Sequence, residues 1–252
     1  MNVFIYIVFS YIIILFLVLF SYKERLSQEK EIIFTSLRCA IQLIALGYLL
    51  KYIFSLKEKY WLILILIVIT FIASVISAER LKIKHVKKSF LIKISFLSLF
   101  ISSVIIFTPC LLIGLIKFTY RETIPLWGLV VGQGINSLNL AQERLFAESL
   151  SKREEIEAKI ALGATLKQAL EDIIKSAITT SLIPRYNDLK TIGIVAIPGI
   201  TTGMLIAGKD PLIAIFYQIL VLYLILGISL FSSYFIIKFS YPFVFFNYST
   251  SE

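Results

Sequence analysis

The stretch NVFIYIVFSYIIILFLVLF, residues 2–20, contains no charged side chain. It is long enough to cross a bilayer as one helix, which needs about 20 apolar residues. The whole chain of 252 residues is 58% hydrophobic and only 16% charged, with a mean hydropathy of +0.89, whereas about a quarter of a typical soluble domain is charged. The sequence therefore predicts an all-α integral membrane protein with one polytopic transmembrane domain over residues 1–252.

Six further apolar runs follow the first, so we expect about seven transmembrane helices. The first run lacks the basic start and the small-residue cleavage site of a secretory signal, so we expect it to be retained. The sixth run is short and contains Pro198-Gly199, which leaves open whether it crosses as one helix or is broken or re-entrant. The expected spans are about 3–21, 32–54, 60–78, 90–116, 124–142, 191–208 and 211–238.

Lysine and arginine are concentrated in alternate connections, at 22–31, 79–93 and 143–190. Because basic connections stay on the cytoplasmic side, we expect a multi-pass protein of the cell (inner) membrane, with its N-terminus outside and its C-terminus in the cytoplasm. This distribution explains the net charge of +9 better than binding to nucleic acid does. The basic run at 80–88, which contains the single histidine His85, is interpreted as an ordinary loop beside anionic headgroups.

The expected cytoplasmic part contains a charged segment, residues 151–180, with apolar residues at helical spacing. Gly163 interrupts the pattern, and glycine is preferred just after a helix end. Thr165 followed by Gln168 fits a capping box, which begins a new helix. We therefore predict helices over about 151–162 and 165–180. Mixed charge favours a membrane-surface helix or docking into a partner's groove over DNA binding.

The same segment resembles the EAA loop of ABC-transporter permeases. Glu157-Ala158, Gly163 and Ile173 match its spacing, whereas Lys159 stands where a second alanine is expected and no Leu-Pro follows Ile173. The resemblance implies a coupling element that docks on the ATP-hydrolysing subunit. The residues that it assigns to coupling are Glu157, Ala158, Gly163, Ala164, Thr165 and Gln168.

A second resemblance covers nearly the whole chain. Four blocks, at 38–55, 162–170, 182–208 and 210–219, are similar in order and spacing to the UPF0014 permease family, which includes the permease of the bacterial iron exporter and plant aluminium-tolerance permeases. The resemblance implies the membrane subunit of an ABC transporter, with iron or another metal ion as the best-known exported cargo. A sugar nucleotide is implicated in a plant branch and stays open as an alternative cargo.

The chain contains no GxxxxGK[ST] phosphate loop, so ATP must be bound by another polypeptide if it powers transport. We expect no cofactor on this chain and an ABC ATPase subunit as its partner. A homodimer is expected because ABC transporters need two ATP sites. The chain is predicted to be a permease subunit and not an enzyme, since no catalytic constellation is visible.

Several polar residues lie at membrane depth, where they are costly and usually face protein or a water-filled path. Two interpretations stay open: hydrogen bonds that hold the helices together, or a translocation path. Gly132 and Gly134 beside them allow close helix packing. Asp188 and Lys190 precede the sixth span and either pair or anchor it. The candidate path residues are Arg38, Gln42, Gln133, Asn136, Asn139, Glu143, Pro198, Gly199, Thr201 and Thr202.

No His, Cys and carboxylate cluster has the spacing of a transition-metal site, so the metal ligands stay unknown and the metal cargo rests on the resemblance. Cys39 and Cys110 lie inside apolar runs and are interpreted as small hydrophobic residues. Two competing functions remain: a secondary transporter or channel without an ATPase, and a membrane assembly protein without cargo.

Overall fold

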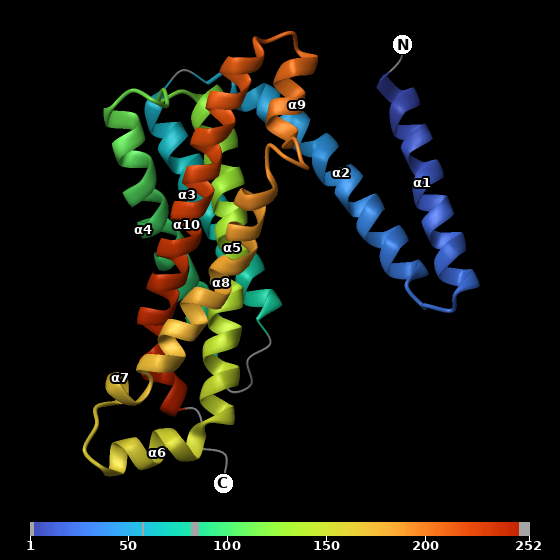
Figure 1. Ribbon diagram of the computed structural model, residues 1–252. Coiled ribbons are helices and arrows are strands. Elements are labelled where there is room, and N and C mark those ends of the chain that lie inside the picture. The colour runs from blue at the N-terminus through green and yellow to red at the C-terminus, as the bar shows by residue number, and fades with distance from the viewer. Residues whose placement is uncertain (1–2, 57, 82–85, 247–252) are drawn as a thin grey trace. The chain divides into compact units, whose positions relative to one another are not determined.

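The computed structural model describes residues 3–56, 58–81 and 86–246, so His85 lies outside the described residues. Over these residues the chain forms ten helices and an isolated bridge between Ile192 and Ala196, which confirms the all-helical prediction. The chain divides into two compact units, Met1–Glu58 and Lys59–Glu252. The helices are α1 (Val3–Lys23), α2 (Glu29–Ile53), α3 (Lys59–Arg80), α4 (Lys88–Leu112), α5 (Tyr120–Ser151), α6 (Arg153–Ala161), α7 (Leu166–Ala169), α8 (Glu171–Thr191), α9 (Gly199–Ile206) and α10 (Pro211–Phe246) (Figure 1).

The N-terminal unit is a hairpin of α1 and α2. The Ser21 hydroxyl donates to Glu29 Oε1 at 2.8 Å and accepts from the Gln28 backbone N–H at 3.2 Å, which ties the two helix ends together. None of the residues in the most apolar 18-residue window of α2 is buried within the protein. A helix that is apolar and unburied is suited to a lipid environment.

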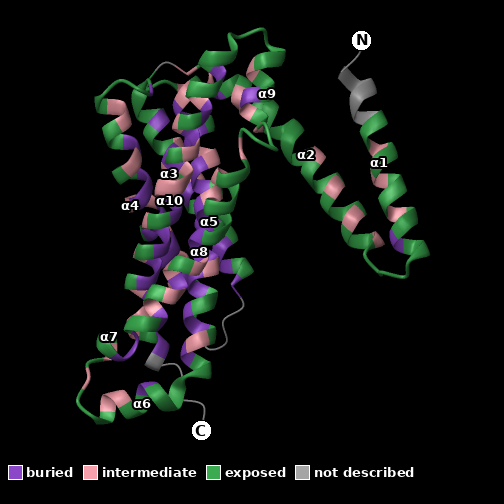
Figure 2. Ribbon diagram, in the orientation of Figure 1, coloured by how far each residue is buried: buried purple, intermediate pink, exposed green. Residues whose placement is uncertain are grey.

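The larger unit is a bundle in which α10 packs on α5 and α4, α3 packs on α4 and α5, and α8 packs on α5 and α10. Buried residues gather where these helices face one another, while the outward faces are exposed (Figure 2). Those outward faces carry large apolar side chains such as Ile63, Phe71 and Phe216. Apolar residues on both faces are typical of helices that lie in a membrane.

Among the described residues, four helical segments are long and apolar enough to cross a membrane: α2, α3, α4 and Pro211–Val244 of α10, with a shorter apolar helix at Phe9–Lys23. They match the expected spans at 32–54, 60–78, 90–116 and 211–238. Helix α4 ends at Leu112, because Gly114 adopts a left-handed φ of +78° that turns the chain. Helix α5 contains the expected span 124–142 within a longer and more polar helix.

The expected sixth span, 191–208, does not form one helix. Helix α8 ends at Thr191, Gly193 has a φ of +85°, and α9 has only 8 residues. At 1.5 Å per residue, such a helix is about 12 Å long and cannot cross a hydrocarbon core of about 30 Å. The break has a local cause, since Gly193 takes a conformation outside helices and Pro198, the N-cap of α9, has no N–H to donate.

The connection 143–190, expected to lie in the cytoplasm, is largely helical, and part of it packs in the bundle. Helix α5 continues to Ser151, and α8 extends to Thr191 along α5 and α10. The expected second helix over 165–180 is interrupted at Leu170 and divided between α7 and α8. Ile173, Ala177 and Ser181 repeat every four residues and are buried, so one face of α8 joins the bundle.

Candidate functional site

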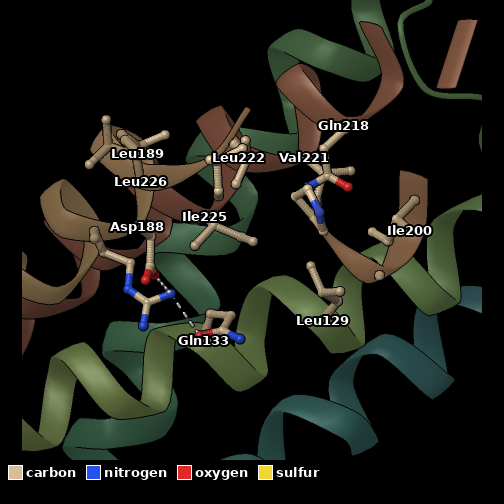
Figure 3. A pocket seen from close by; sticks show the side chains of 14 residues that line it. Leu129, Gln133, Asp188, Leu189, Ile200, Gln218, Val221, Leu222, Ile225 and Leu226 are labelled. Atoms are coloured by element: carbon tan, nitrogen blue, oxygen red, sulfur yellow. Dashed lines mark hydrogen bonds and ion pairs between the residues drawn. The ribbon is translucent and has the colours of Figure 1, made fainter. Parts of the chain in front are cut away.

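A cavity of about 380 Å³ lies within the larger unit, between α5, α8, α9 and α10 (Figure 3). Its wall is mostly apolar, with side chains such as Leu129, Val221, Leu222 and Ile225. Four side chains add polar groups to this wall: Gln133, Arg185, Asp188 and Gln218. A mostly apolar cavity with a few convergent polar groups is the usual form of a small-ligand site.

Arg185 supplies the charge on one side of this cavity. Its side chain is only 16% exposed, and Nη1 donates to Gln133 Oε1 at 2.9 Å and pairs with Asp188 Oδ2 at 3.1 Å (Figure 3). Arg185 Nε is buried and has no hydrogen-bond partner among the described residues. Asp188 therefore pairs with Arg185, and not with Lys190 as one sequence interpretation had it.

The opposite side of the cavity comes from the broken region and from α10. Pro198 and Gly199, both candidate path residues, line it directly. Thr201 is buried and its hydroxyl lies 3.4 Å from Gln218 Oε1, which places the amide of Gln218 at the wall. Thr202 is exposed, and its hydroxyl donates to the carbonyl of Pro198, the N-cap residue of α9.

The four polar candidate residues on α5 lie in different environments. Gln133 reaches the cavity. Asn136 is exposed and accepts a hydrogen bond from Arg80 Nη1 at 3.2 Å. Asn139 is buried and accepts from the Ser77 hydroxyl, so it connects α5 to α3. Glu143 is exposed near the end of the helix.

The remaining two candidate path residues, Arg38 and Gln42, are exposed on α2 in the N-terminal unit. The eight candidates in the larger unit do not form one stripe. The structure brings Gln133, Pro198 and Gly199 to one cavity, with Thr201 behind its wall. Arg185 and Gln218 line the cavity but were not among the predicted residues. The sequence signal for Gln218 is a single amide inside an otherwise apolar run, since such groups are costly in lipid.

We expect the contact between Ser77 and Asn139 to stabilise the bundle. In a double-mutant cycle with Ser77→Ala and Asn139→Ala, the coupling free energy should be about 0.6 kcal/mol and at most about 1.7 kcal/mol, the range for such bonds within membranes. Reversible unfolding in mixed detergent micelles measures it. The exposed Asn136 provides the control, because Asn136→Ala should not couple to Ser77→Ala; a zero coupling for the Asn139 pair would contradict the assignment.

The second candidate element, the 151–180 segment, has the predicted turn at its centre. Gly163 has a φ of +95°, the left-handed conformation expected after a helix end. The capping box is confirmed: Thr165 Oγ1 accepts from the Gln168 N–H at 3.3 Å, and Gln168 Oε1 accepts from the Thr165 N–H at 2.8 Å. The turn and the start of α7 are therefore specified by neighbouring residues.

The tip of this segment presents apolar and small residues outward. Leu162 is 89% exposed, and Ala158 and Gly163 are exposed beside it. Around them lie ion pairs such as Lys159 with Glu155 at 2.7 Å, where Lys159 lowers the pKa of the Glu155 carboxyl by hydrogen bonding and by its charge. Ile156 and Ile173 are instead buried and hold the segment to the bundle.

A protein-family model described as an uncharacterised protein family, UPF0014, matches residues 4–245. The chain belongs to the UPF0014 family. This confirms the resemblance that the sequence blocks indicated. Together with the candidate spans it makes the chain a multi-pass membrane protein.

Curated UPF0014 relatives match most of the chain. The probable iron export permease protein FetB of Escherichia coli (strain K12) is 36% identical over 210 residues, which are 83% of this chain and 80% of the relative. The protein ALUMINUM SENSITIVE 3 of Arabidopsis thaliana is 31% identical over 222 residues, 88% of this chain and 80% of the relative. A UPF0014 membrane protein of Synechocystis sp. is 35% identical over 206 residues, 81% and 78% respectively. No solved structure matches the chain.

The family model covers both candidate elements, the cavity and the tip. No group of three or more His, Cys, Asp and Glu side chains lies close enough to hold a metal ion in the part of this UPF0014 chain that the structure describes. The polar groups available at the cavity are a guanidinium, a carboxylate and two carboxamides. These groups can bind a ligand by hydrogen bonds and by charge.

Proposed function

We propose that the chain is the membrane-spanning permease subunit of an ATP-binding cassette transporter, a homodimer that works with a separate ATP-hydrolysing subunit. The observation that carries the proposal is the exposed tip between α6 and α7 at one end of the bundle (Figure 1). A short turn with an exposed Leu162 beside Gly163 suits a groove on a partner protein. ATP is bound and used by that partner.

The proposed coupling is mechanical. Helix α6 begins at Arg153, two residues after α5 ends, and α7 leads into α8 across Leu170. Helix α5 carries Gln133 and α8 carries Arg185, so both helices attached to the tip also supply polar groups to the cavity. A partner that moves the tip therefore pulls on two walls of the cavity at once, as bistable packed elements transmit motion between sites.

The proposed topology has seven membrane passes. The sixth pass is a broken segment and not a single helix over 191–208. Helix α8, the irregular residues 192–198 and α9 together connect the end of the bundle that holds α6 to the end where α10 begins (Figure 1). Irregular backbone at membrane depth is tolerated where it lines a cavity or is buried in protein, and Pro198 and Gly199 do line one. Basic connections support an outside N-terminus and a cytoplasmic C-terminus in the cell (inner) membrane.

The proposed cargo is iron or another metal ion, moved out of the cell. Support comes from the name of the Escherichia coli relative, a probable iron export permease, at 36% identity. The described lining of the cavity includes one carboxylate and no His or Cys, and a site without strong metal ligands fits export, because a transporter must also release its cargo.

A mild-detergent pull-down of the tagged full-length protein from its own membranes tests this proposal. We expect a near-stoichiometric partner that carries a phosphate loop, and a particle mass that corresponds to two permease chains and two ATPase chains. Cross-linking from a cysteine placed at Leu162 should then join the permease to that partner. If the protein is recovered without any ATPase even after cross-linking through 151–180, the ABC proposal is wrong and transport driven by an ion gradient becomes the function to test.

A further inference from the structure

The second half of helix α8 runs beside the apolar part of α5. Ser176 of α8 donates to Glu148 of α5. Arg185, later on α8, donates to Gln133, earlier on α5, so the two helices are antiparallel. The residues after Arg185 therefore lie beside the residues that precede Gln133. That part of α5, residues 124–132, contains no charged side chain and belongs to an expected membrane span.

Lys190 lies on this part of α8, is exposed, and has no hydrogen bond or ion pair within the part of the chain that the structure describes. A lysine at membrane depth is unfavourable against lipid and almost always pairs with an acidic group or faces water within protein. The backbone that follows at 192–198 is irregular, and Ile194 is 85% exposed there. Lipid does not satisfy irregular backbone. Both features indicate that further protein covers this face of α8.

The outward face of α8 has the pattern of a helix-packing seam with charged flanks. Pro184, Asn187 and Thr191 recur at steps of three and four residues, so they form one stripe, and all three are exposed. Asp188 and Lys190 lie on opposite sides of this stripe, each about 80° from its centre at 100° per residue. When two parallel helices pack along such a stripe, oppositely charged flanking residues pair across the interface and set the choice of partner.

This charge pattern is complementary to itself. Two copies of the chain in one membrane have the same orientation and are related by a two-fold axis along the membrane normal, so their α8 helices run parallel. The stripe of one copy then meets the stripe of the other, and each Lys190 lies beside the partner subunit's Asp188. Asp188 is 51% exposed, and only its Oδ2 is engaged by Arg185. A carboxylate accepts hydrogen bonds at both oxygens, so Oδ1 remains for the lysine.

We propose that α8 is the contact between two copies of this chain, with Pro184, Asn187 and Thr191 on the seam and Lys190 paired with the partner subunit's Asp188. The inference rests on the homodimer of the proposed function and names the surface that forms it. Asp188 also lines the cavity. Each copy therefore contributes a lysine to the edge of the other copy's cavity, and the cavity is complete only in the dimer.

Disulfide cross-linking of the full-length protein in its own membranes tests the seam. Cys39 and Cys110 are first replaced by alanine, and Asn187→Cys is then introduced. We expect copper phenanthroline to convert most of this variant to a covalent dimer, because parallel copies place position 187 of each α8 against the other. Ile72→Cys is the matched control, since Ile72 is 52% exposed on the outward face of α3. This control should remain monomeric after oxidation.

Lys190→Glu tests the charge pairs. The new carboxylate would lie opposite the partner subunit's Asp188, and like charges across an interface oppose association. We expect self-association in nanodiscs or liposomes, measured by fluorescence energy transfer between labelled copies, to be at least about tenfold weaker. Lys190→Arg keeps the charge and should associate as the original protein does. Lys209→Glu, at an exposed lysine between α9 and α10, controls for the change in net charge.

The outcomes separate this inference from the proposed function. Cross-linking at position 187 but not at position 72, together with weaker association of Lys190→Glu, supports the α8 contact. A dimeric mass without cross-linking at position 187 overturns the inference and leaves the homodimer standing, because the copies then meet elsewhere. Equal self-association of Lys190→Glu and the original protein overturns the charge pairing. A mass of one permease chain contradicts the homodimer, and the inference fails with it. None of these measurements involves the ATPase, so recovery of that partner is tested independently.

Discussion

Replacement of Gly163 by tryptophan is expected to abolish ATP-driven transport and to remove the ATPase partner from the pull-down. Gly163 is exposed, and a Cβ added to it would have no neighbour within 4 Å. The indole therefore has open space in the isolated chain. Against a docked partner the same side chain has no room, so the loss should reach at least about tenfold in partner recovery, which corresponds to about 1.4 kcal/mol of binding free energy.

The backbone at Gly163 adds a second effect that must be separated from docking. Its φ of +95° is strained for any residue with a Cβ, and a non-glycine residue in this conformation is disfavoured by about 1–2 kcal/mol. Gly114 provides a matched control, because its φ is +78° and a Cβ there also has no neighbour within 4 Å. It lies after α4, at the opposite end of the same unit from α6 and α7 (Figure 1).

Gly114→Trp should therefore keep the partner and the transport activity, while both variants reach the membrane in similar amounts. The measurements are recovery of the ATPase by quantitative mass spectrometry and ATP hydrolysis by the purified complex. Normal partner recovery and transport by Gly163→Trp would show that the tip between α6 and α7 is not the docking element. Equal losses in Gly163→Trp and Gly114→Trp would assign the effect to backbone strain and folding.

The apolar helices could be predicted from the sequence because nearly every residue of a lipid-facing helix is apolar. The runs that became α3, α4 and α10 carry that signal along their whole length. The turn at Gly163 with its Thr165–Gln168 cap was also predictable, since both depend on neighbouring residues alone. The first half of α8 lies within the helix predicted over 165–180, but its continuation to Thr191 and its packing in the bundle were not predicted, because its burial depends on small residues such as Ala177 that fit against α5 and α10.

In the candidate site, too, features that depend on neighbouring residues could be predicted, whereas features that depend on tertiary contacts could not. Pro198 and Gly199 were predicted because a proline and a glycine inside an apolar run indicate irregular backbone, and both line the cavity. Arg185 was counted as one of many basic residues of a cytoplasmic connection. Only the tertiary path of α8, which brings Arg185 within 2.9 Å of Gln133 on α5, gives it a place in the site. Sequence spacing carries no information on such a contact between residues so far apart.

Replacement of Gly134 by valine should have the largest effect on stability among the glycine positions of α5. A Cβ added at Gly134 would lie 2.9 Å from Ile228 Cγ1 and 3.1 Å from Leu99 Cδ2. Leu99 and Ile228 are both fully buried, so neither side chain has free space into which to move. Overpacking of this kind lowers the free energy of unfolding by about 1–3 kcal/mol, and a β-branched residue lies at the upper end.

Gly132→Val is the matched control, two residues away on the same helix, because a Cβ there has no neighbour within 4 Å. We expect its unfolding midpoint in mixed micelles to stay near that of the original protein, while the midpoint of Gly134→Val falls. The two variants also test how the cavity is held. Gln133, next to Gly134 on α5, lines the cavity together with Gln218 of α10, so a displacement of α5 from α10 at Gly134 should also change the shape of the cavity. Equal stability of the two variants would mean that α5, α4 and α10 are not in close contact at Gly134, and the geometry proposed for the cavity would lose its support.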